Sequence, residues 1–192
     1  MSRFLRFAAM LLLVSCGGQG SPPRNLDDAC AIAGERPEYL RAMQQAEARW
    51  GVPVHVQMAT IYQESKFDAK ARTPHRYALG IIPMGRQSSA YGFSQAIDGT
   101  WDDYRKGTGR RSARRDRIQD ATDFMGWYMD GTTRRLGIAK SDAANQYLAY
   151  HEGRGGFSRG SHLNKSWLLR VSGDVQRRSQ MYQAQLRSCG RA

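Results

Sequence analysis

The sequence lacks any apolar run long enough to cross a bilayer as a helix, which argues against a membrane-spanning domain. The apolar run at residues 7–14 has about the length of a signal-peptide core, and Arg3 and Arg6 precede it. Internal repeats are absent, strand signals are scarce, and the 4 histidines show no metal-ligand spacing. These features predict an exported, helical protein that needs no metal and no cofactor.

Cysteine is also rare, with 3 residues in 192, and the first cysteine follows the apolar run closely. Residues 13–16 read Leu-Val-Ser-Cys and match the bacterial lipobox, in which the cysteine is diacylated and becomes the new N-terminus. Two acyl chains hold a protein stably on a membrane. Because Gly17 follows Cys16, the aspartate typical of inner-membrane retention is absent. We therefore expect an outer-membrane anchor at Cys16 that faces the periplasm; a secretory signal cleaved nearby is the alternative.

The other two cysteines, Cys30 and Cys189, lie near the two ends of the region expected to fold. In an oxidising periplasm we expect them to form a disulfide, which stabilises a domain by constraining its unfolded state. Two buried free thiols are the alternative. The predicted organisation is a signal peptide at residues 1–15, a flexible tether at 16–27 and one domain at 28–192. We expect this domain to be a monomer.

Acidic residues are fewer than basic ones, with Asp+Glu at 17 against Lys+Arg at 29 and a formal net charge of +12. This balance predicts an anionic partner, but envelope carboxylates, phosphates and nucleic acid would all qualify. The basic run at residues 105–117 invites a nucleic-acid interpretation, with a solvated basic loop as its alternative. Because the N-terminal segment directs the chain to the envelope, we expect no nucleic-acid partner.

Apolar residues recur at helical spacing along most of the chain. The pattern predicts helices over residues 38–50, 54–65, 94–104, 115–136 and 142–151, and a last helix from an Asn164 N-cap towards Cys189. Between them, residues 66–91 form a long connection whose apolar side chains are expected to pack: Tyr77, Leu79, Ile81, Ile82 and Met84. The pattern as a whole predicts a mainly α single domain of about six helices.

Three short segments stand out through their order and spacing. Residues 61–71 close the second predicted helix with the pair Glu64-Ser65. Residues 90–101 contain a Gly-x-x-Gln turn that ends at Gln95, and residues 147–156 end a helix with Tyr150 and His151. In this order, the segments resemble the motifs of the soluble-lytic-transglycosylase (SLT) domain, and the resemblance covers residues 50–156.

The resemblance implies a lysozyme-like, mainly helical fold with a groove for a glycan strand. It implies cleavage of peptidoglycan between N-acetylmuramic acid and N-acetylglucosamine without water, which leaves a 1,6-anhydro ring on the muramic acid. Carried over by position, Glu64 is the single catalytic acid and base, and Ser65 supports the active-site turn. Gln95 reaches the sugar, and Tyr150 lies in the groove beside Glu64.

Two features depart from the family pattern. His151 stands where the family has asparagine. An imidazole can also donate a hydrogen bond to an acetamido group, so we group His151 with Ser65, Gln95 and Tyr150 as candidate substrate-binding residues; a packed or capping histidine is the alternative. The connection from Glu64 to Gln95 is longer than the family's usual spacing, which predicts a remodelled groove.

One carboxyl can suffice for this reaction. Glu64 must be protonated near neutral pH to give a proton to the leaving oxygen, which requires an apolar setting, with Ile61 and Tyr150 as the expected walls. The carboxylate then takes the proton of the sugar's own C6 hydroxyl, which attacks C1 within the same molecule. Glycosidases that use water generally need two carboxyls.

Each candidate residue also has a purely structural interpretation. Glu64 could be a solvated helix-end residue paired with Lys66 or Lys70, Gln95 a helix-start residue, and Tyr150 a core residue. Other carboxyls could make the chain a hydrolytic muramidase, although caps, surface groups and arginine partners are commoner roles: Asp98, Asp102 and Glu152. A catalytically silent peptidoglycan-binding lipoprotein is the remaining alternative, and the intact Glu64-Ser65 pair argues against it.

Overall fold

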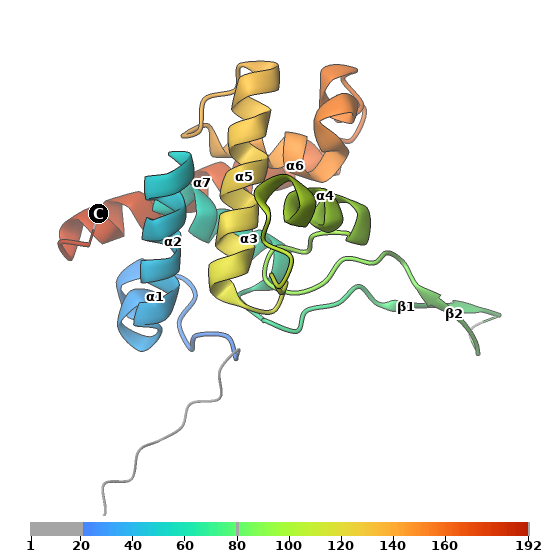
Figure 1. Ribbon diagram of the computed structural model, residues 1–192, viewed down its shortest axis with the longest axis horizontal. Helices are drawn as coiled ribbons and strands as arrows, with labels where there is room; N and C mark the ends of the chain where they lie inside the picture. The colour runs from blue at the N-terminus through green and yellow to red at the C-terminus, as the bar shows by residue number, and fades with distance from the viewer. Residues whose placement is uncertain (1–20, 80, 192) are drawn as a thin grey trace, which may run out of the picture.

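The computed structural model describes residues 21–79 and 81–191, and helices dominate it (Figure 1). The expected Cys16 anchor lies outside the described residues. Within them are seven helices: α1 (Ala29–Glu35), α2 (Pro37–Trp50), α3 (Val54–Ser65), α4 (Asp98–Thr108), α5 (Ile118–Leu136), α6 (Ala143–Ser158) and α7 (Ser166–Ser188). Two short strands, β1 (His75–Ala78) and β2 (Ile82–Arg86), complete the fold. The mainly α prediction is confirmed, with one helix more than expected.

The core lies where the long helices cross. Helix α2 packs along α5, while α3 and α6 pack along α7. Each of these five helices contributes an apolar face to one cluster, with Met43 of α2, Ile61 of α3 and Met125 of α5 fully buried. Burial of such a side chain contributes about 1.5–3 kcal/mol to folding. A smaller aromatic cluster centred on Tyr104 and Phe124 joins α4 to α5.

Helix α3 spans the residues that its apolar periodicity predicts. Pro53 precedes its first residue, and Val54, Met58 and Ile61 are buried. The buried amide of Gln57 donates hydrogen bonds to the carbonyl oxygens of Met43 and Val52, at 3.0 and 2.8 Å. These bonds join the first turn of α3 to the middle of α2 and to Val52, which lies between the two helices. The N-terminal end of α3 is therefore fixed against α2.

The connection from α3 to α4 contains the β1–β2 hairpin, which projects from the helical body (Figure 1). We expected its apolar side chains to pack, and for three of them this was wrong. Leu79, Ile81 and Met84 are 89%, 78% and 65% exposed. The side chains lie on a projecting two-stranded ribbon, which has no third strand or helix to cover it.

Three helix starts differ from the prediction, and one short helix was missed. Helix α5 begins at Ile118 rather than residue 115. Helix α4 begins at Asp98 rather than residue 94, because residues 91–96 form a turn in which Gln95 has φ of 47°. Helix α7 has Lys165 at its N-cap position, not Asn164. Helix α1 was missed; its 7 residues are too few for periodicity to reveal, although Asp28 caps it by accepting from two backbone N–H groups.

The two ends of the described chain meet on α7. A disulfide joins Cys30 of α1 to Cys189 after α7, 159 residues apart in sequence. Leu26 and Asp27, which the sequence placed in the tether, already contact α7, since Arg178 bonds the carbonyl oxygen of the first and the carboxylate of the second. No described helix is long and apolar enough to span a membrane.

Candidate functional site

A cavity of about 550 Å³ lies between α3, α5, α6 and the segment that leads into α4. All three of the sequence segments singled out above contribute to its lining. Four candidate site residues line it: Glu64, Gln95, Tyr150 and His151. The remaining lining residues are Thr73, Ser88, Ala90, Ala96, Ile97, Thr100, Phe124, Tyr128, Glu152 and Gly153. Segments that are up to some 90 positions apart in sequence therefore meet at one site.

Glu64 is the next-to-last residue of α3, and its carboxyl is partly buried in the cavity. Burial raises the pKa of Glu64 from 4.5 to about 7, because the ionised form loses contact with water. A hydrogen bond with Tyr147 and the charge of Lys66 lower the pKa by smaller amounts. A carboxyl with such a pKa holds its proton in about half of the molecules at neutral pH, so it can donate it.

The chain leaves α3 through a turn that fixes the position of Glu64. Lys66 and Phe67 have φ of 52° and 62°, a left-handed region that costs a non-glycine residue about 1–2 kcal/mol. Phe67 is fully buried and stacks on Tyr39. Ser65 is buried, and its hydroxyl donates to the carbonyl of Ile61 at 3.2 Å. Ser65 is not part of the cavity lining, so its position suits support of the turn rather than contact with a ligand.

Gln95 reaches the cavity from a turn that closes the long connection. Its amide nitrogen donates to the carbonyl oxygens of Ala71 and Gly92, at 3.0 and 2.8 Å. Gly92 has φ of 76°, and a Cβ there would meet the carbonyl oxygen of Arg115 at 2.1 Å. Only glycine fits this approach. Both amide N–H groups have backbone acceptors, which leaves the amide oxygen of Gln95 as the group suited to accept from a ligand hydroxyl.

Tyr150 lies on α6 and forms part of the apolar wall of the cavity. Its hydroxyl donates to the carbonyl of Ser94 at 2.6 Å. Its ring meets Phe124 and Tyr128 edge to face. Burial, with the nearby charge of Glu64, raises the pKa of Tyr150 well above its usual value, so the phenol stays neutral. Tyr150 is therefore both a packed residue and a cavity residue.

His151 and Glu152, which directly follow Tyr150 in the third motif, line the same cavity. The Nδ1 atom of His151 lies 3.1 Å from Glu152 Oε1, and Lys165 Nζ donates to the same carboxylate at 2.7 Å. The hydroxyl of Ser161 is also bonded to Glu152. Hydrogen bonds from Lys165 and Ser161, the main causes, lower the pKa of Glu152 to about 2. Glu152 is therefore a fixed negative charge at neutral pH.

Sequence reasoning missed the contact between Tyr147 and Glu64. Tyr147 is buried on α6, three residues before Tyr150, and its side chain hydrogen-bonds with both Gln63 and Glu64. Because residues three apart share a helix face, the third motif already carried the signal that both tyrosines approach α3. Tyr147 therefore belongs to the immediate surroundings of the Glu64 carboxyl.

The other carboxyls considered from the sequence lie elsewhere. Asp98 pairs with Arg115 at 2.7 Å, and Asp102 pairs with Arg105 at 3.5 Å. Neither aspartate lines the cavity of Glu64. The described residues contain no group of three His, Cys, Asp or Glu side chains that could hold a metal ion. Glu64 and Glu152 are the only carboxyls among the lining residues, one with a raised pKa and one a fixed anion, and Gln95 and His151 add polar groups beside them.

Comparison with known proteins agrees with this geometry. A protein-family model described as a transglycosylase SLT domain matches residues 4–189. The match includes all three motif segments and every residue that lines the cavity. It confirms the lysozyme-like fold class that the motifs implied. No curated protein matched the chain.

Proposed function

Since the chain belongs to the transglycosylase SLT domain family, we propose that it is a peptidoglycan lytic transglycosylase in which Glu64 is the sole catalytic carboxyl. The family implies peptidoglycan as the substrate and lytic transglycosylase activity in general. The observation that supports the finer statement is the convergence of Glu64, Gln95 and Tyr150 on one cavity, with the Glu64 carboxyl desolvated.

The proposed reaction has two proton transfers and no water. Protonated Glu64 gives its proton to the glycosidic oxygen as the bond from that oxygen to C1 of the muramic acid breaks. The electron pair leaves with the N-acetylglucosamine hydroxyl, and C1 becomes cationic. The Glu64 carboxylate then takes the proton of the C6 hydroxyl, whose oxygen bonds to C1 and forms the 1,6-anhydro ring. Glu64 is protonated again at the end of the cycle.

The surrounding residues suit the same cycle. Tyr147 and Tyr150 exclude water from one side of the carboxyl, and Tyr147 stabilises the anion that forms after the first transfer. The amide oxygen of Gln95 accepts a sugar hydroxyl, and His151 donates to an acetamido group. The turn at Lys66 and Phe67 holds the carboxyl in place while it changes charge.

Hydrolysis is the second candidate function, because Glu152 lines the same cavity and is ionised. A retaining or inverting hydrolase needs a carboxylate as nucleophile or base in addition to the acid. Against this role, the oxygens of Glu152 already bind Lys165 and Ser161, so the carboxylate is paired with a cation and held in place. A silent binding protein is less favoured, because a buried carboxyl with a raised pKa has a cost in stability that binding alone does not require.

Product analysis tests the proposed reaction. Purified sacculi are digested with the protein, and the soluble fragments are analysed by mass spectrometry. We expect muramic acid ends that carry the 1,6-anhydro ring, which are lighter by one water than free reducing ends. Free reducing ends would establish hydrolysis instead. Release of neither product by protein that binds sacculi would establish the silent alternative.

We also propose that residues 1–15 are a signal peptide and that a lipid on Cys16 anchors the protein in the outer membrane. The supporting evidence is the lipobox and the short apolar run. A Cys16→Ser variant, expressed in a bacterial envelope, should move from the membrane to the soluble fraction. Lipid on the N-terminal fragment of the parent protein, seen by mass spectrometry, should disappear in the variant. An unchanged distribution would contradict the anchor.

A further inference from the structure

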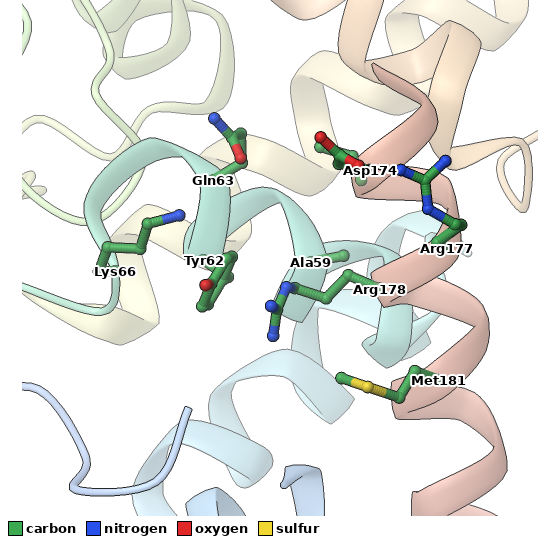
Figure 2. A pocket seen from close by; sticks show the side chains of 9 residues that line it. Ala59, Tyr62, Gln63, Lys66, Asp174, Arg177, Arg178 and Met181 are labelled. Atoms are coloured by element: carbon green, nitrogen blue, oxygen red, sulfur yellow. Dashed lines mark hydrogen bonds and ion pairs between the residues drawn. The ribbon is translucent and has the colours of Figure 1, made fainter. Parts of the chain in front are cut away.

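A second cavity, of about 410 Å³, lies between the C-terminal half of α3 and the middle of α7 (Figure 2). Three of its lining side chains are cationic, namely Lys66, Arg177 and Arg178. One lining side chain, Asp174, is anionic. The apolar part of the lining includes Met181, and none of these residues lines the cavity of Glu64.

Two of the cations converge on one aromatic ring. Lys66 Nζ lies 3.6 Å from the centre of the Tyr62 ring, and the guanidinium carbon of Arg178 lies 3.4 Å from it. Figure 2 shows the Tyr62 side chain between the two cations, with Lys66 directly after the end of α3 and Arg178 on α7. Contact with the ring stabilises each cation, but their charges repel. Burial and the charge of Arg178 lower the pKa of Lys66, as such repulsion requires.

The acids nearby do not balance this charge. Asp174 pairs with its neighbour on α7, Arg177, and both side chains are exposed. Asp27 pairs with Arg178 at 2.8 Å but is not part of the cavity lining. The lining therefore keeps a net positive charge, with the Lys66 ammonium directed into the cavity (Figure 2). A cavity of this kind favours an anionic ligand through charge-assisted hydrogen bonds.

The backbone conformation of Lys66 costs free energy, and glycine or asparagine at this position would reduce that cost. Its φ of 52° lies in the left-handed region, where glycine is favoured and asparagine is tolerated. Strained residues of this kind cluster at functional sites, and this one brings an ammonium to the edge of α3. The strain therefore agrees with a binding role for the Lys66 side chain.

The cavity adjoins the candidate active site. Gln63 lines the second cavity and Glu64 lines the first, and the two residues are consecutive in α3. Tyr147 hydrogen-bonds with both side chains. The proposed substrate carries its carboxylates on stem peptides, and these branch from the same muramic acid whose C1 reacts.

We propose that this cavity binds a carboxylate of the peptidoglycan stem peptide while the glycan strand occupies the cavity of Glu64, an inference that rests on the proposed function. Lys66 holds the carboxylate, and Arg177 and Arg178 add to the positive field. Met181 and the ring of Tyr62 contact the aliphatic part of the peptide. The cavity thereby makes the enzyme prefer strands that still carry peptides.

Titration of the folded protein with a synthetic stem peptide, followed by calorimetry, tests the binding site directly. The Lys66→Asn variant removes one cation at a position where asparagine is tolerated, and Arg177→Gln removes an exposed one. We expect each variant to bind about fivefold more weakly, as loss of one partly exposed charge pair would give. Asp174→Asn removes the lining acid and should bind about twofold more tightly. Arg170→Gln, an equal change of charge on α7 outside the cavity, should bind like the parent.

Two further probes identify the ligand. An amidated stem peptide should bind at least tenfold more weakly than the acid form, since its carboxylates are blocked. Inorganic phosphate should bind more weakly than the peptide; equal or tighter phosphate binding would assign the cavity to phosphate and overturn the proposal. Equal binding of the acid and amidated peptides, or equal losses in Arg170→Gln and Lys66→Asn, would also overturn it.

Cleavage is measured separately, with glycan strands from which the peptides have been removed. Cleavage of bare strands without any peptide binding would overturn this inference and leave the proposed function intact. Peptide binding without cleavage of either substrate would support the peptide site and contradict the proposed function. If both hold, kcat/KM for peptide-bearing strands should exceed that for bare strands, and Lys66→Asn should lower this ratio by about fivefold.

Discussion

The cavity holds two glutamates whose surroundings differ. Glu64 faces the tyrosines of α6, and burial raises its pKa to about 7. Glu152 meets Lys165, Ser161 and His151, and these contacts lower its pKa to about 2. The same side chain is therefore a proton donor at one position and a fixed anion at the other. Neighbouring groups, rather than residue type, set which carboxyl can act as the acid.

The largest expected effect comes from replacing the neutral acid. Glu64→Gln should lower kcat/KM on sacculi by about 10²–10⁴-fold, because an amide cannot transfer the proton. Release of soluble fragments measures this loss. The stability of the variant serves as its folding control. Because the pKa of Glu64 is raised in the folded state, the parent loses stability as pH rises from 4.5 through about 7. The glutamine of the variant does not titrate. At pH 8 the variant should therefore avoid a cost of about 2–3 kcal/mol. Full activity in this variant would contradict the proposed mechanism.

The activity of the parent should fall on the alkaline side. Because the acid form of Glu64 starts the reaction, kcat/KM should decrease about tenfold per pH unit above its pKa of about 7. Between pH 7 and pH 9 the decrease should reach about 50-fold, because half of the Glu64 carboxyls are already ionised at pH 7. Initial rates on sacculi at constant ionic strength give the profile. A rate that rises through pH 7 would instead mean that ionised Glu64 begins the reaction.

Replacing the fixed anion should have a smaller effect. Glu152→Gln should lower kcat/KM by about tenfold or less, because it loosens His151 without removing the acid. The products should keep their 1,6-anhydro ends. A loss as large as that in Glu64→Gln would instead identify Glu152 as the second carboxyl of a hydrolase.

The stability of the same variant provides an independent measurement. The pKa of Glu152 is lowered in the folded chain, so its stabilisation is present above pH 4.5 and is lost as pH falls towards 2. With Lys165 partly exposed, its contribution at pH 7 is about 1–2 kcal/mol. Denaturant unfolding should show this decrease for Glu152→Gln at pH 7 and almost none at pH 2.

The smallest expected effect comes from replacing Tyr147 of α6, which contacts Glu64 of α3. The hydrogen bond with Tyr147 lowers the pKa of Glu64, so Tyr147→Phe should move the alkaline limb of the rate profile up by less than about one unit. Tyr39→Phe removes a buried hydroxyl outside the cavity and should leave the limb in place. A downward shift in Tyr147→Phe would show that the hydroxyl does not stabilise the anion.

The sequence predicted the helices more accurately than the long connection between α3 and α4. Apolar periodicity located α2 and α3 to within one residue, because each helix buries one continuous face. The same apolar residue types in the connection gave a wrong expectation for Leu79 and Ile81, since composition does not say whether a neighbour covers a side chain. The N-cap expected at Asn164 was also wrong. A turn in which the Lys165 N–H donates to the carbonyl of His162 runs through Asn164, so the helix begins only after Lys165.

For the candidate site, the sequence alone determined which three segments form it and in which order they follow along the chain. The motifs around Glu64, Gln95 and Tyr150 name the family and identify the carboxyl to test, because these local patterns do not depend on distant residues. Only the tertiary structure decided the charge of each carboxyl. The burial of Glu64 needs α6 packed near α3, and the lowered pKa of Glu152 needs Lys165, 13 positions later. Desolvation and ion pairing depend on distances in space, which a linear pattern does not contain.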